Sequence, residues 1–192
     1  MRSPIDKKII LASNSPRRRQ LLKEIIPDFQ IAESREVNES YSSDLSPDDV
    51  APYLSQIKAE AYLDLIKDEA VLITADTVVI LENEILGKPS DKGEAFRMLK
   101  KLSGKKHKVV TGITIKSAEK TDTFSCETSV YFDKLTDSEI MEYIDEFKPF
   151  DKAGSYGIQE WIGCRGISHI EGCFYNVMGL PINTLYNRLS KF

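Results

Sequence analysis

The run VLITADTVVIL at residues 71–81 constrains the fold most, because it is almost wholly apolar and rich in β-branched residues. Such residues favour a strand, and a strand that is apolar on both faces has to be buried between other elements. Helical patterns precede and follow this run along the chain. The sequence therefore predicts an alternating α/β architecture around a buried strand at 71–81.

Local signals place the other elements. Pro16 and Pro47 mark helix starts, Ser46 is expected to cap the second helix, and Thr136 with Glu139 forms a capping box. We expect strands at residues 8–12, 29–34, 71–81, 85–86, 108–116 and 123–132, the last two antiparallel, and helices at 16–26, 47–67, 91–102, 136–147 and from about 181. The polar segment 36–44 is predicted to be a mobile loop.

Length and composition bound the class of protein. A chain of 192 residues fits one domain, 1–192, with room for two lobes, and a net charge of −4 gives no basic field for nucleic acid. The N-terminal MRSPIDKK lacks the apolar segment of a signal peptide, and no apolar run reaches membrane-spanning length. Three cysteines without C-x-x-C spacing predict reduced thiols, so we expect a cytoplasmic protein.

The segment IILASNSPRR at residues 9–18 reads as a strand, a hydroxyl-rich turn and a helix start. Free backbone N–H groups at a helix N-terminus attract anions. Arg17 and Arg18 in the first turn oppose the helix dipole, and an anionic ligand would resolve that conflict. The pattern favours a phosphate site, and the alternative is two solvated arginines beside an ordinary serine cap.

Asp76, followed by Thr77, interrupts the apolar strand. A carboxylate there is costly unless it is paired, metal-bound or at a cleft. This favours a functional acid over a strand-end aspartate bonded to nearby backbone. Lys88 lies between a glycine and a proline, which suits close approach to a ligand but also fits a solvated loop. Lys58, judged by its helix alone, reads as part of a solvated face.

The segment DKAGSYGIQ at residues 151–159 brackets a serine and a tyrosine with glycines and ends in an amide. An amide offers both a donor and an acceptor, so this loop suits recognition of a planar polar group. A simple turn between strands is the alternative. His107 and His169 are too far apart in the sequence to indicate a metal pair, and His107 is expected in the core or on the surface.

Taken in order, these signals resemble the Maf family of nucleoside triphosphate pyrophosphatases, formerly called septum formation proteins. The matching segments are LASNSPRR, Lys58-Ala59, TADTVVILENEILGKP, LSGKKHKVVTGI, DKAGSYGIQ and NVMGLPI, which together span residues 11–182. The loop AGSYGIQ is similar to the subgroup that acts on dTTP and UTP. Residues 160–171, EWIGCRGISHIE, depart from a more glycine-rich family pattern.

The resemblance implies hydrolysis of a nucleoside triphosphate to the monophosphate and pyrophosphate, with a divalent cation, Mg²⁺ or Mn²⁺. It also implies a mixed twisted sheet flanked by helices, in two lobes around a deep nucleotide-binding cleft. Glu39 and Asp76 are suitable oxygen ligands for the metal. Asp76 is also the expected general base, and its base and ligand roles are not separated by the sequence.

Cations suit a triphosphate, so Arg17, Arg18, Lys58 and Lys88 are expected to clamp it. The expected catalytic residues are Asp76, Glu39, Lys58 and Lys88. Ser13 and Thr77 are expected to bond phosphate or to order the metal shell. Gln159 is expected to pair with the O4 and N3 edge of uracil or thymine.

Two other classes of function stay open at this point. One is a non-catalytic nucleotide sensor that regulates cell division, which would bind without releasing pyrophosphate. The presence of both Glu39 and Asp76 argues against it, since a sensor needs no base. The other is a nucleic-acid-binding module, against which the acidic charge argues. The sequence leaves open the oligomeric state, monomer or homodimer, and the physiological nucleotide among dTTP, UTP and modified uridine nucleotides.

Overall fold

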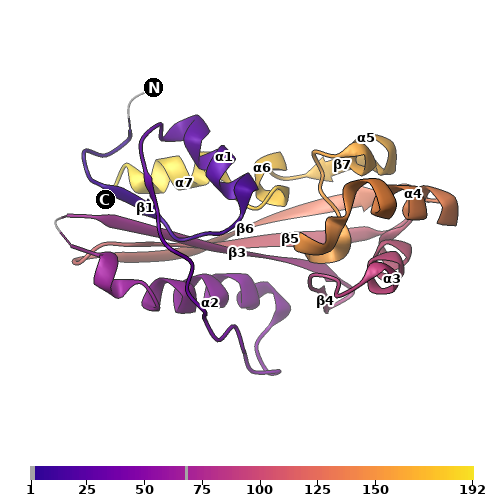
Figure 1. Ribbon diagram of the computed structural model, residues 1–192, viewed down its shortest axis with the longest axis horizontal. Coiled ribbons are helices and arrows are strands. Elements are labelled where there is room, and N and C mark those ends of the chain that lie inside the picture. The colour runs from indigo at the N-terminus through magenta and orange to yellow at the C-terminus, as the bar shows by residue number, and fades with distance from the viewer. Residues whose placement is uncertain (1–2, 68) are drawn as a thin grey trace. The chain divides into compact units, whose positions relative to one another are not determined.

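The computed structural model describes residues 3–67 and 69–192. Its strands form one mixed sheet in the order β2-β1-β3-β5-β6-β7, and β4 pairs with β3 (Figure 1). β1 is parallel to both β2 and β3, whereas β4 and β7 are antiparallel to their neighbours. Together with the flanking helices, this confirms the predicted mixed α/β class. None of the helices in the described part of the chain is long and apolar enough to cross a membrane.

The chain divides into two compact units. The first comprises Met1–Asp76, Thr111–Cys126 and Gly179–Phe192, and the second comprises Thr77–Val110 and Glu127–Met178. The first unit contains β1 (Ile9–Leu11), α1 (Pro16–Ile25), β2 (Gln30–Ile31), α2 (Pro47–Glu60), a 3₁₀ turn η1 (Leu63–Leu65) and α7 (Ile182–Leu189). β3 (Val71–Leu81), β5 (Lys106–Lys116) and β6 (Thr121–Phe132) each continue from one unit into the other.

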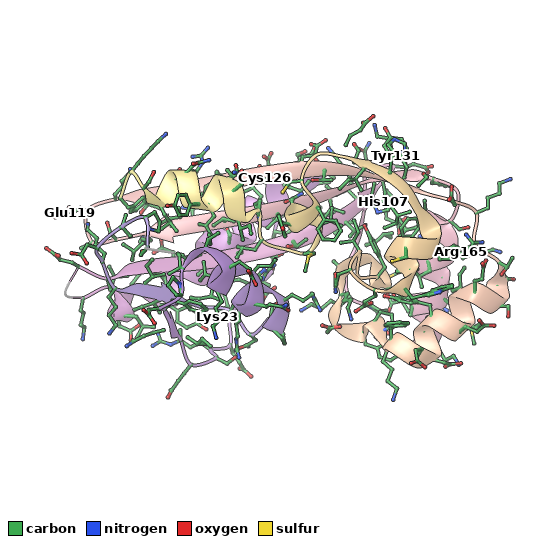
Figure 2. All side chains as sticks on the ribbon, turned by 90° about the horizontal axis from the view of Figure 1, so that it is seen from above. Lys23, His107, Glu119, Cys126, Tyr131 and Arg165 are labelled. Atoms are coloured by element: carbon green, nitrogen blue, oxygen red, sulfur yellow. The ribbon has the colours of Figure 1, made fainter. Side chains whose placement is uncertain are left out.

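In the first unit, helices cover both faces of the strands. Figure 1 shows α1 and α7 on one face and α2 on the other. Cys126 on β6, labelled in Figure 2, has its thiol 3.5 Å from Oγ1 of Thr184 on α7. Leu11 and Ile73 are paired in the parallel register and are fully buried, as a strand covered on both faces requires.

α2 lies unusually close to the sheet. The Ser55 hydroxyl on α2 is 2.9 Å from that of Thr114 on β5, and Thr74 on β3 donates to the Ser55 carbonyl at 2.6 Å. A methyl group built on Gly112 of β5 would lie 2.1 Å from the Pro52 nitrogen and 2.2 Å from the Ala51 carbonyl carbon. The absence of a side chain at Gly112 is therefore what lets the helix backbone approach the strand.

The second unit contains the remaining parts of β3, β5 and β6 and its own shorter elements. These are β4 (Glu84–Leu86), α3 (Lys92–Leu102), α4 (Asp137–Phe147), η2 (Pro149–Asp151), η3 (Ala153–Ser155), α5 (Trp161–Gly166), β7 (Ile167–Glu171) and α6 (Phe174–Val177). Its core packs Leu99 of α3 and Ile144 of α4 against Val79 and Val130 of the sheet. The Thr136–Glu139 capping box is present at the start of α4, as predicted.

Several predicted boundaries were wrong. The second helix ends at Glu60 rather than at residue 67, and the strand expected at 29–34 is reduced to Gln30–Ile31. Ser46 holds the cap position, but its side chain makes no cap hydrogen bond to any described residue. Its carbonyl accepts from the Asp49 N–H at 2.9 Å instead. Residues 160–171, the departure from the family pattern, form α5 and β7.

Candidate functional site

An ion-paired cluster in the first unit brings together three of the predicted site residues. Lys58, in the last turn of α2, places Nζ 2.5 Å from Oδ1 of Asp76 on β3 and 3.2 Å from Oε1 of Glu39. Glu39 comes from the segment between β2 and α2. The lysine and Asp76 side chains are only 17% and 15% exposed, whereas Glu39 is 51% exposed. One ammonium group thus holds two carboxylates of different solvent access.

The alternation of side chains along β3 explains how Asp76 reaches α2. Thr74 and Asp76 are two residues apart and share a face of the strand. Both bond to α2, Thr74 to the Ser55 carbonyl and Asp76 to the Lys58 ammonium. The same alternation places the Thr77 side chain on the opposite face of β3 from Asp76. Asp76 thus meets an ammonium, whereas the alternative expectation was a bond to nearby backbone.

The expectation that Lys58 lies on a solvated helix face was wrong. Ala51, Ser55 and Lys58 follow one another at spacings of four and three residues, so they share a face of α2. Ala51 and Ser55 are fully buried against the sheet. The small residues at those two positions are the sequence signal that could have placed Lys58 beside the strand.

The chemistry of this cluster fits a hard divalent cation. Mg²⁺ is commonly bound by one or two carboxylates, with water and substrate phosphates completing its shell. Asp76 and Glu39 already approach one cationic group, the Lys58 ammonium. The described residues hold no group of three or more His, Cys, Asp or Glu side chains that could bind a metal. Asp76 and Glu39 are the two oxygen donors that such a cation would meet in this cluster.

Arg18 contacts the backbone of β3 next to Asp76. Its Nε donates to the Gly179 carbonyl and its Nη1 to the Ala75 carbonyl, both at 2.9 Å. Burial lowers the pKa of the Arg18 guanidinium, and the nearby Asp76 carboxylate opposes that shift. Because Ala75 immediately precedes Asp76, this arginine fixes the backbone beside the candidate base. Its predicted contact with phosphate stays a prediction.

The turn between β1 and α1 is held by local hydrogen bonds. Ser13 accepts from the Ser15 N–H at 3.3 Å, and its carbonyl accepts from the Arg19 guanidinium at 3.2 and 3.1 Å. The Ser15 hydroxyl accepts from the Arg18 N–H at 3.4 Å and so caps α1. Sequence reasoning did not name Arg19, whose role in fixing this turn has no local pattern to reveal it. Arg17 is half-buried and lies close enough to Arg18 to lower its pKa.

The second unit holds the other predicted residues, Thr77, Lys88 and Gln159. Lys88 is exposed on the loop after β4, and the preceding Gly87 carbonyl accepts from the Gly154 N–H at 3.0 Å. This bond joins the lysine loop to the DKAGSYGIQ segment. Gln159 is exposed at a shallow, mainly apolar groove of about 440 Å³, lined by Ile158, Gln159, Gly163, Cys164, Ile167, His169, Ile170 and Phe174.

His107 is a core residue, in agreement with one of the two expectations for it. It is 3% exposed, and its Nε2 is 2.8 Å from the hydroxyl of Tyr156, which belongs to the DKAGSYGIQ segment. Burial lowers the pKa of His107 to about 4, so its ring is neutral near pH 7. It therefore acts as a fixed support under the loop.

Comparison with known proteins gives one consistent result. A family model described as "Maf-like protein" matches residues 8–192. A protein of Porphyromonas gingivalis named "dTTP/UTP pyrophosphatase" is 50% identical over 187 residues, covering 96% of this chain and 94% of the relative. Proteins with the same name from Parabacteroides distasonis and Bacteroides thetaiotaomicron are 48% and 46% identical. They cover 96% and 95% of this chain, and 96% and 95% of their own lengths.

Two solved structures share the fold at low sequence identity. The Ham1 protein of Staphylococcus aureus has a TM-score of 0.57 and 20% identity, covering 96% of this chain and 99% of that one. The HAM1 protein of Coxiella burnetii has a TM-score of 0.52 and 12% identity, covering 97% of this chain and 100% of that one. At these identities the likeness supports the fold alone.

Proposed function

Because this chain belongs to the Maf family, we propose that it hydrolyses dTTP and UTP to their nucleoside monophosphates with release of pyrophosphate. The names of its relatives support the choice of these two nucleotides. The observation that carries the proposal is the Lys58 ammonium between Asp76 and Glu39. A largely buried carboxylate beside a cation suits proton abstraction next to a polyanionic substrate.

In the proposed reaction, a water oxygen attacks the α-phosphorus, and Asp76 accepts the water proton. The new bond joins that oxygen to phosphorus, and the bond from the α-phosphorus to the α–β bridging oxygen breaks. The electron pair of the broken bond leaves with pyrophosphate. Lys58 contributes positive charge that offsets the negative charge developing on the phosphoryl oxygens in the transition state.

The remaining residues bind the substrate and fix its position. Arg17 and Lys88 supply charge-assisted hydrogen bonds to phosphate oxygens. Ser13 and Thr77 supply hydroxyl groups for phosphate or for ordering the metal shell, and Gln159 recognises the pyrimidine edge. Mg²⁺ or Mn²⁺, held by Asp76 and Glu39, would supply a Lewis acid that neutralises phosphate charge when bound.

We further propose that the protein acts in the cytoplasm, alone or as a homodimer, without nucleic-acid or membrane partners. The free thiols of Cys126, Cys164 and Cys173 support a reducing compartment. The net charge of −4 supports the absence of a nucleic-acid partner.

The test is product analysis with purified protein. The chain is incubated with Mg²⁺ or Mn²⁺ and with dTTP, UTP, CTP, ATP and GTP in turn, and pyrophosphate and orthophosphate are measured separately. We expect pyrophosphate and the monophosphate from dTTP and UTP, and no such release with Asp76→Asn prepared in parallel. Orthophosphate as the primary product would contradict cleavage between the α and β phosphates. Tight binding without turnover would favour a sensor.

A further inference from the structure

A network of three polar side chains in the second unit joins the DKAGSYGIQ segment, through Lys152, to Tyr143 and Glu160. Lys152 places Nζ 3.1 Å from Oε1 of Glu160, and the Tyr143 hydroxyl of α4 donates to the other carboxylate oxygen. Tyr143 is 1% exposed and Lys152 is 8% exposed. Burial, and then the bond to Glu160, raise the pKa of the Tyr143 hydroxyl, so it stays protonated as a donor.

The network reaches the segment's backbone one residue after Tyr156. The Tyr143 hydroxyl accepts from the Gly157 N–H at 3.1 Å, while the Glu160 N–H donates to the Gly157 carbonyl at 3.0 Å. Both backbone groups of Gly157 are therefore used. A buried hydroxyl that bonds a backbone N–H and a carboxylate together fixes the spacing between them.

Gln159 and Glu160 fold back over Gly157. A methyl group built on Gly157 would lie 2.8 Å from Nε2 of Gln159, 2.8 Å from Cδ of Glu160 and 3.0 Å from its Oε2. The glutamine amide nitrogen and the carboxylate thus face the same side of this glycine. A carboxylate accepts hydrogen bonds and donates none, so it favours the amide nitrogen over the amide oxygen on that side.

The start of the segment is fixed separately. Gly154 has a φ of +67° and sits so close to β3 that an added methyl group would lie 3.0 Å from both γ-carbons of Val79. Its N–H donates to Gly87, and Tyr156 is held by His107. These contacts fix the backbone at the start of the segment and at Gly157. They do not fix the orientation of the Gln159 side-chain amide.

We propose that Tyr143, Lys152 and Glu160 are positioning residues that hold the Gln159 amide in one orientation and thereby set the preference for uracil and thymine over cytosine. In this arrangement the Glu160 carboxylate favours an amide N–H of Gln159 on its side. The other N–H and the amide oxygen remain for O4 and N3–H of the base. Cytosine presents an amino group and an unprotonated nitrogen at these positions, so it would need the flipped amide. This inference rests on the proposed function, because it concerns base selection in that reaction.

The decisive experiment compares Tyr143→Phe with Tyr131→Phe. The first change removes a buried hydroxyl while keeping the ring. The second removes the hydroxyl of Tyr131 on β6, which is labelled in Figure 2 and donates to Glu171 of β7 at 2.9 Å. Catalytic efficiency, kcat/KM, is measured with UTP and CTP for each variant. We expect Tyr143→Phe to lower the UTP-to-CTP ratio by about 5-fold or more and Tyr131→Phe to leave the ratio unchanged.

A second comparison separates positioning from general damage. In a Gln159→Ala background, Tyr143→Phe should change the ratio no further, because the group that it positions is gone. Lys152→Met should lower the UTP-to-CTP ratio as Tyr143→Phe does. Lys152→Arg keeps the positive charge, so its ratio should lie between those of Lys152→Met and the unaltered protein. If Tyr143→Phe does not fold, Glu160→Gln takes its place, since it keeps the size and an acceptor for Tyr143 but loses the charge facing Lys152.

The outcomes distinguish this inference from the function on which it rests. If the unaltered protein hydrolyses no nucleotide to pyrophosphate, the proposed function fails, and this inference with it. If the unaltered protein prefers UTP to CTP and Tyr143→Phe lowers both efficiencies equally, the inference alone is overturned. A further fall of the ratio in the Gln159→Ala background would also overturn it.

Discussion

Lys58 on α2 and Asp76 on β3 form an ion pair in which both side chains are more than four-fifths buried, 17% and 15% exposed. Each partner relieves the cost of removing the other from water. Because Glu39 is 3.2 Å from the same ammonium and far more exposed, Asp76 is the better shielded of the two carboxylates. The pair therefore links the stability of the first unit to its chemistry.

The Lys58→Met variant should have a lower free energy of unfolding and a lower activity than the unaltered protein. The change leaves the Asp76 charge without its ammonium partner in a largely buried position, which costs at least about 1–3 kcal/mol of unfolding free energy. Urea unfolding would measure it. The double variant Lys58→Met/Asp76→Asn should be more stable than Lys58→Met alone, because the stranded charge is gone. Equal stability of the two would show that the ion pair contributes little.

Asp76→Asn should lower kcat by about 10²–10⁴-fold, because the amide is nearly the same size but is a poor proton acceptor. Circular dichroism and thermal unfolding check that the fold is retained. Glu39→Gln is the matched comparison: it should raise the metal concentration needed for half-maximal activity and leave the choice of nucleotide unchanged. Near-normal turnover by Asp76→Asn would move the base role to another residue, with Glu39 as the next candidate.

Arg17→Ala and Lys88→Ala should depress activity on dTTP, UTP and CTP by similar factors, because we expect both side chains to contact phosphate, which all nucleotides share. Steady-state kinetics on the three substrates measures this. Arg18→Lys provides the contrast. This variant should lower the melting temperature as well as the activity, since the Arg18 guanidinium that it removes donates to two backbone carbonyls. Selective loss for one base with Arg17→Ala would assign that arginine to base recognition.

Gln159→Ala should lower the preference for UTP and dTTP over CTP by about 5- to 150-fold, the range that corresponds to one mismatched buried hydrogen bond of roughly 1–3 kcal/mol. The ratio of kcat/KM values is the measurement. Lys88→Ala serves as the control because it should alter efficiency without altering the ratio. An unchanged ratio in Gln159→Ala would place base selection elsewhere, with Arg17 or Thr77 as the next candidates.

His107 should make the folded state less stable in mild acid. Its pKa is about 4 in the fold because of burial, and 6.5 is its ordinary value, so the unfolded chain binds a proton first as pH falls. This contribution to the free energy of unfolding is complete above about pH 6.5 and is lost as pH falls toward about 4. At pH 5 the loss is about 2 kcal/mol. Urea unfolding at pH 7 and pH 5 should show a larger loss for the unaltered protein than for His107→Gln. Parallel losses in the two proteins would contradict the assignment.

The parts of the fold that were predicted well have strong local signals. β3 was predicted with its observed bounds because β-branched residues fill it, and α3 and α4 were predicted because caps and apolar spacing coincide. α2 was predicted too long, since its apolar period continues into residues that form η1 instead. There Tyr62 turns its hydroxyl to accept from the Arg35 N–H, a tertiary bond that no local pattern indicates.

The candidate site divides in the same way. Asp76 could be singled out from the sequence alone, because an acid within an apolar strand is a residue type at an unusual position. The pairing of Asp76 with Lys58 depends on how a helix packs on a sheet, and spacing along the chain does not reveal that packing. Tyr143 was missed because an aromatic residue on the inner face of α4 reads as core. Its hydroxyl, which donates to Glu160 and accepts from the Gly157 N–H, adds a polar role that the apolar spacing of α4 does not indicate.

The bare backbone at Gly112 has a consequence for how this protein can change. An added methyl group there would need the space now held by the backbone at Ala51 and Pro52, so the helix would have to lift from the sheet. Lys58 is on the same helix, and lifting it would draw the ammonium away from Asp76. A position with no chemistry of its own therefore acts as the spacer of an acid–lysine pair. Random mutagenesis should find substitutions at Gly112 among the inactivating changes, although no reactive group is altered.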